Sequence, residues 1–88
     1  MGTIETLAAK LAEDTLTVMD ATGEDRLYVE VGSVLATASQ SLEEAFLTEV
    51  RVRLAERTAR RFLNLRAAKA KASAGADGRP APAPKPGQ

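Results

Sequence analysis

The chain contains no cysteine, no histidine and no tryptophan among its 88 residues. Without cysteine it has no disulfides and no thiolate metal ligands, and without histidine it lacks the side chain that most often transfers protons near neutral pH. Its carboxylates include adjacent pairs such as Glu13 and Asp14, but neighbouring residues on a helix or strand point apart. We therefore expect no enzyme, no metal site, no cofactor and no small-molecule substrate.

Long apolar runs are also missing. No stretch approaches the roughly 18 apolar residues of a membrane-spanning helix, and no basic segment followed by an apolar run marks a secretory leader. We expect a cytoplasmic protein without a membrane partner. The alanine- and arginine-rich composition without cysteine or histidine is more typical of a bacterial protein.

Aromatic residues are few, with only Tyr28, Phe46 and Phe62. The sequence predicts one small domain over residues 1–73 with a thin core, and such domains often gain stability by oligomerising or by docking on a partner. Residues 74–88 are rich in alanine and proline and are predicted to form a disordered tail whose role the sequence leaves open.

What the chain does have is a strong charge asymmetry. Residues 1–50 hold ten acids and two bases, and residues 51–88 hold ten bases and two acids, so charges of −8 and +8 sum to a net charge of zero. Such opposite surfaces must cancel by folding back, cancel between chains, or serve different partners.

The N-terminal segment has apolar residues at helical spacing. Ile4, Leu7, Ala8 and Leu11 recur every three or four residues, with Thr3 as the expected N-cap and Glu5 in the first turn. The end of this helix is ambiguous. It either continues to about Ala21 with Gly23 as the C′ residue, or gives way to a strand over residues 15–19.

The strand alternative leads to a β-hairpin. Residues 15–19 are rich in β-branched side chains, residues 20–25 have turn-forming chemistry, and residues 26–31 alternate between apolar and polar. We favour this hairpin, while residues 15–19 remain open between strand and helix. Residues 33–40 fit either a short helix or an irregular connection.

A long helix is predicted next. Ser41 and Glu44 form a capping-box pattern at its start. An apolar stripe follows at spacings of three and four and occupies an arc about 120° wide: Leu47, Val50, Leu54, Thr58, Phe62 and Leu65. Its period is that of a straight helix, which disfavours a long coiled coil. Leu42 and Phe46 broaden the apolar surface at the start of the helix, which we expect to pack on the N-terminal elements.

The predicted fold is therefore α+β, with an N-terminal helix, a β-hairpin, a long C-terminal amphipathic helix and a disordered tail. If the hairpin does not form, the alternative is a mainly α helical hairpin with one short strand.

The long helix is also the candidate functional element. Arginine beside apolar residues is favoured at protein interfaces because guanidinium pairs with carboxylates and packs along its stem. We expect a small adaptor, inhibitor or regulatory subunit that binds a protein partner or forms a homo-oligomer. The predicted protein-binding residues are Phe46, Leu47, Val50, Leu54, Phe62 and Leu65, with Arg53, Arg57, Arg60 and Arg61 at the margin.

The alternative function is nucleic-acid binding through phosphate contacts. The residues predicted for it are Arg51, Arg57, Arg61, Arg66, Lys69 and Lys71. A ribbon-helix-helix dimer is disfavoured as its specific form, because Glu43 and Glu44 would face the phosphate backbone at the helix start.

Overall fold

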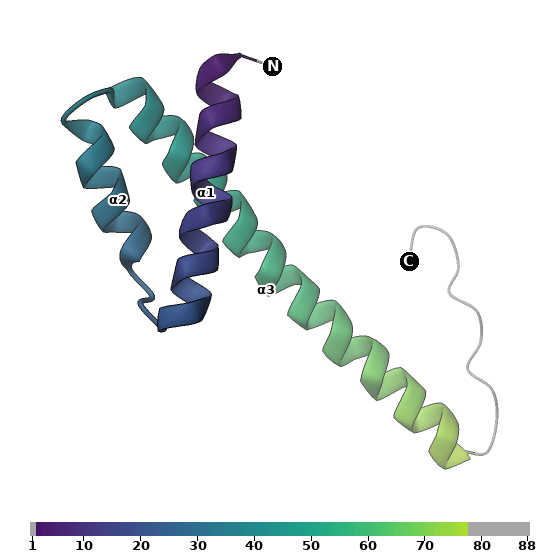
Figure 1. Cartoon of the computed structure of the whole chain (residues 1–88). Coiled ribbons are helices and arrows are strands. Elements are labelled where there is room, and N and C mark those ends of the chain that lie inside the picture. The colour runs from purple at the N-terminus through teal and green to yellow at the C-terminus, as the bar shows by residue number, and fades with distance from the viewer. Residues whose placement is uncertain (1, 78–88) are drawn as a thin grey trace. The chain divides into compact units, whose positions relative to one another are not determined.

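The computed structural model describes residues 2–77 as three helices: α1 (Thr3–Thr22), α2 (Leu27–Ala36) and α3 (Gln40–Asp77) (Figure 1). No strand occurs within this range. The predicted α+β fold with its β-hairpin is therefore wrong, and the mainly helical alternative fits, although the short strand that it includes is not found among residues 2–77.

Helix α1 takes the longer course that its sequence allows. Gly2 is its N-cap, instead of the predicted Thr3, and Glu5 lies in the first turn as expected. The helix continues through residues 15–19 and ends at Gly23, whose φ of 77° is left-handed and whose N–H donates to the Met19 carbonyl over 2.8 Å. Glycine adopts this conformation without steric cost, so Gly23 ends a helix where we predicted the turn of a hairpin.

The β-branched run is helical because the helix satisfies its hydroxyls and buries its core-facing side chains. The hydroxyls of Thr17 and Thr22 donate to carbonyls four residues earlier, over 3.0 and 2.8 Å. Thr15 and Leu16 are buried on the same face as Ala8 and Ala12. Strand propensity is weak beside such tertiary packing, which here decides the conformation.

Helix α2 occupies the segment that alternates in sequence. The same residues also contain a helical spacing, since Tyr28, Val31 and Leu35 are half-buried and pack against the core. Val29, which the strand interpretation places on the apolar face, is exposed. Six alternating residues are too few to distinguish a strand from a helix, and the structure follows the longer helical spacing of Tyr28, Val31 and Leu35.

Helix α3 starts slightly earlier than predicted. The Leu42 N–H donates to the Ser39 hydroxyl over 3.1 Å, so Ser39 caps the helix. Glu44, the expected partner of Ser41 in a capping box, instead accepts a bond from the Gln40 amide over 3.4 Å. The prediction of a long helix is confirmed, but the predicted capping box is wrong.

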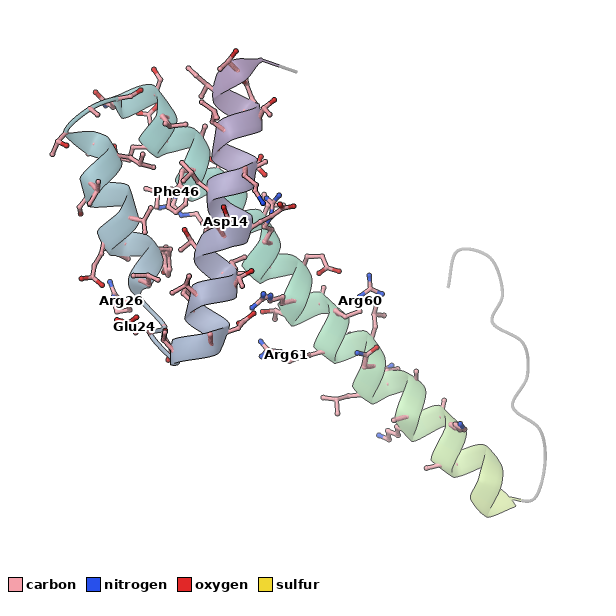
Figure 2. The ribbon with its side chains drawn as sticks, viewed as in Figure 1. Asp14, Glu24, Arg26, Phe46, Arg60 and Arg61 are labelled. Atoms are coloured by element: carbon pink, nitrogen blue, oxygen red, sulfur yellow. The ribbon has the colours of Figure 1, made fainter. Side chains whose placement is uncertain are left out.

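The core lies where the three helices meet. Ala8, Ala12 and Leu16 of α1 pack against Phe46 and Val50 of α3, all at most 4% exposed. Phe46 is the largest of these side chains and lies among the helices in Figure 2. The expectation that the start of the long helix packs on the N-terminal elements is thus confirmed.

The chain divides into two compact units, Met1–Ala55 and Glu56–Gln88, which we call the first and second unit. Helix α3 contributes to both. The predicted single domain, residues 1–73, spans both units. The helix also enters the predicted tail, residues 74–88, as far as Asp77, and the prediction for residues 78–88 lies outside the described residues.

Candidate functional site

The apolar residues predicted for partner binding fall into a buried and an exposed group. In the first unit, Phe46 and Val50 are fully buried, and Leu47 and Leu54 are half-buried. These four residues of α3 belong to the core of the first unit or pack against it. Their apolar character is accounted for by folding.

Arg53, the predicted margin residue in this unit, also has a structural role. Its side chain is 28% exposed, and it forms an ion pair with Glu49 one turn earlier, as its spacing suggests. Its Nη2 atom lies 4.0 Å from Oε1 of Glu13, so the guanidinium also links α3 to α1. Because α1 and α3 both hold it, Arg53 contributes to the first unit more than to an open surface.

The second unit presents the rest of the stripe to solvent. Phe62, Leu63 and Leu65 are 58%, 54% and 72% exposed, and they lie within four consecutive positions of α3. Leu63 was not among the predicted contact residues, since it lies outside the stripe. At 100° per residue, Phe62 and Leu65 lie on one side of α3 and Leu63 on another. Large apolar side chains left exposed on a helix mark a candidate interaction surface.

Arginines surround these apolar residues. The Arg66 guanidinium lies 5.2 Å from the centre of the Phe62 ring, a cation–π arrangement, and Arg61 donates to the Thr58 hydroxyl over 3.4 Å. Arg60 pairs with Glu56, one turn earlier, over 3.0 Å. Figure 2 shows Arg60 and Arg61 leaving α3 on different sides. The face with Phe62 therefore has Arg61 and Arg66 at its edges.

Charge changes sign at the division between the units. The first unit holds ten acids and four bases, a formal charge of −6, and the second holds two acids and eight bases, a charge of +6. No acid occurs from residue 57 to residue 76. Thus the six residues predicted for nucleic-acid binding are all exposed, and five of them, all except Arg51, belong to this basic stretch.

The structure adds an acidic groove that was not predicted from the sequence. It runs between the N-terminal parts of α1 and α3 in the first unit, and it is lined by Ile4, Glu5, Ser41, Glu44, Ala45, Thr48 and Glu49. The only hint in the sequence is the helical spacing of Ser41, Ala45, Thr48 and Glu49. Those small and polar residues gave no reason to place α1 beside them.

A second groove lies between α2 and α3 and is more mixed in character. Its lining includes Arg26 and Arg51 but also Glu43, beside Tyr28 and Leu47. Arg26 and Arg51 are both exposed, and the half-buried Glu43 brings the opposite charge to the same lining. This groove is therefore a weaker candidate for specific recognition than the acidic one.

Two kinds of feature are absent from the described residues. No helix there has both the length and the apolar character to cross a membrane. Among the same residues no three acidic, histidine or cysteine side chains gather closely enough to hold a metal ion. In comparisons with known proteins, no family model, curated protein or solved structure matches the chain.

Proposed function

We propose that the protein is a small non-enzymatic adaptor, inhibitor or regulatory subunit, and that it binds a protein surface through the second unit's part of α3. The observation that carries this proposal is the exposure of Phe62, Leu63 and Leu65 within a basic helix. Protein interfaces typically combine such apolar anchors with arginine at their margin.

The chemistry of the segment specifies the kind of surface it binds. Phe62 and Leu65 lie on one side of the helix, and an apolar contact that removes them from water contributes about 25 cal/mol per Å² of buried apolar area. Arg61 and Arg66 beside Phe62 need acidic partners, with which guanidinium forms paired hydrogen bonds. The partner is therefore a protein surface on which carboxylates border an apolar strip.

Nucleic-acid binding is the second candidate, supported by the absence of acids from residue 57 to residue 76. A single strand could stack a base on Phe62 and contact the arginines through phosphates. It would leave Leu63 and Leu65 in water, however, and both are more than half exposed. The apolar residues therefore favour a protein partner.

Photocrosslinking tests this proposal directly. A photoreactive phenylalanine analogue replaces Leu65 in the second unit, and in a matched control it replaces Val34, which is 69% exposed on α2. We expect position 65 to give discrete crosslinks to protein in the native cells and position 34 to give none. These crosslinks should disappear when Arg61 and Arg66 are both changed to Glu.

The contrary results are equally specific. Crosslinks from position 65 to nucleic acid would favour the second candidate. Equal crosslinking from positions 65 and 34, or crosslinks that persist after both arginines are reversed, would contradict the proposed protein-binding surface.

A further inference from the structure

The acidic groove and the basic helix have complementary chemistry, and one chain carries both. The groove offers Glu5 and Glu44 from two helices, with Ile4 and Ala45 as apolar lining. The helix offers Arg61 and Arg66 beside exposed apolar side chains. We propose that the groove of one copy binds the side of residues 57–71 that carries Phe62 in a second copy; this inference rests on the proposed function and names its partner.

The carboxylates of the groove are not neutralised within the first unit. Glu49 is paired with Arg53, but within residues 2–77 neither Glu5 nor Glu44 forms an ion pair with a base. The Glu44 carboxylate accepts a hydrogen bond from the neutral amide of Gln40. Two exposed carboxylates on neighbouring helices repel each other, and a cation placed between them relieves that repulsion.

Arg61 and Arg66 of the helix likewise have no acidic partner within residues 2–77. Arg61 donates to the neutral Thr58 hydroxyl and Arg66 lies over the Phe62 ring. They are five positions apart, a rise of about 7.5 Å along the helix. They can therefore reach carboxylates on both walls of a groove while Phe62 enters between them.

The apolar parts also match. Ile4 is 41% exposed although it begins the apolar pattern of α1, and it lines the groove. Phe62 and Leu65 of a second copy would cover it. Docking would thus withdraw apolar side chains of both partners from water while it pairs their charges.

Self-association also accounts for the charge balance. Each copy carries one groove in a unit of charge −6 and one helix in a unit of charge +6. Two copies can therefore satisfy both sites of each other, and the assembly has no net charge. Contacts between unlike surfaces of this kind form a closed dimer or ring when the rotation between copies closes, and an open chain when it does not.

Charge exchange between two full-length variants tests the inference. The groove variant carries Glu5→Arg and Glu44→Arg, and the helix variant carries Arg61→Glu and Arg66→Glu. Sedimentation equilibrium of the wild-type chain should show association that weakens as salt rises. Each variant alone opposes like charges, so its dissociation constant should rise by roughly 30-fold or more.

An equimolar mixture of the two variants should associate again, because each groove then meets a helix of opposite charge. Matched controls are Glu24→Arg with Asp25→Arg, which lie outside the groove lining, and Arg60→Glu with Lys71→Glu, which lie on the side of α3 away from Phe62. These controls should associate more nearly like the wild-type chain. Circular dichroism of every variant should show the helix content of the wild-type chain.

Three results would overturn the inference. In the first, the wild-type chain stays monomeric up to about 1 mM, so that any dissociation constant is above this value. In the second, the groove and helix variants associate as the wild type does, and in the third their mixture does not associate. The first of these, together with crosslinks from position 65 to a different protein, would leave the proposed function standing. The first together with crosslinks to nucleic acid would overturn both.

Discussion

Gly32 of α2 lies directly against Leu47 of α3, so that a Cβ atom at position 32 would lie 3.3 Å from Cδ2 of Leu47. Gly32 is buried in the middle of a helix, where glycine costs about 1 kcal/mol relative to alanine. The close approach of α2 and α3 therefore depends on Gly32, whose low helix propensity destabilises α2.

This contact gives opposite expectations for small and large replacements. Gly32→Ala should change the free energy of unfolding by less than about 1 kcal/mol, because the gain in helix propensity offsets a small shift of the Leu47 side chain. Gly32→Val should destabilise the protein by about 2 kcal/mol or more, because its methyl groups cannot fit against Leu47. Urea denaturation of both variants measures the difference, and a valine variant as stable as the wild type would contradict this packing.

The two phenylalanines should differ sharply in their contribution to stability. Phe46 is fully buried and Phe62 is 58% exposed. Phe46→Ala should lower the free energy of unfolding by about 3–5 kcal/mol, enough to unfold so small a domain, whereas Phe62→Ala should change it by less than about 0.5 kcal/mol.

Val50→Ala is a milder core variant that should still fold, with an expected decrease of about 2 kcal/mol in the free energy of unfolding. Chemical denaturation at a low protein concentration separates these effects from association. A Phe62 variant that loses as much stability as the Val50 variant would show that Phe62 belongs to the core of the monomer.

The start of α3 can be located by comparing two serines. Ser39 accepts the N–H of Leu42, so Ser39→Ala should cost about 1 kcal/mol of stability. Ser41 is exposed in the first turn, and Ser41→Ala should be neutral or slightly stabilising because alanine favours helix. Thermal melts followed by circular dichroism compare the two, and the reverse order would return the cap to the position expected from the sequence.

The helical parts of the fold differ in how far the sequence could predict them. The long α3 follows from its apolar spacing, which continues over five turns and fits no other element. Residues 15–31 were harder, because β-branched side chains, turn-forming residues and six alternating positions all favour a hairpin. Packing of Leu16 in one core with Phe46 decides for helix, and these residues are 30 positions apart in sequence.

The sequence predicts which residue types form the candidate site, but not which of them are exposed. Phe46 and Phe62 are both predicted contact residues of one amphipathic helix, and the sequence does not tell which of them α1 covers. The structure assigns Phe46 to the core and leaves Phe62 exposed. The acidic groove depends on α1 lying beside α3, so residue patterns along one helix could not show it.

Hydrogen–deuterium exchange as a function of protein concentration tests the central claim, that residues 57–71 await a protein surface. At low concentration the amides of α3 from residue 42 to residue 54 should exchange slowly, because they pack on the core, and those from residue 57 to residue 71 should exchange much faster. At concentrations where the chain associates, or with a captured partner, the second set should become protected. Slow exchange of residues 57–71 in the dilute monomer, or no change in their exchange when a partner is bound, would contradict the account.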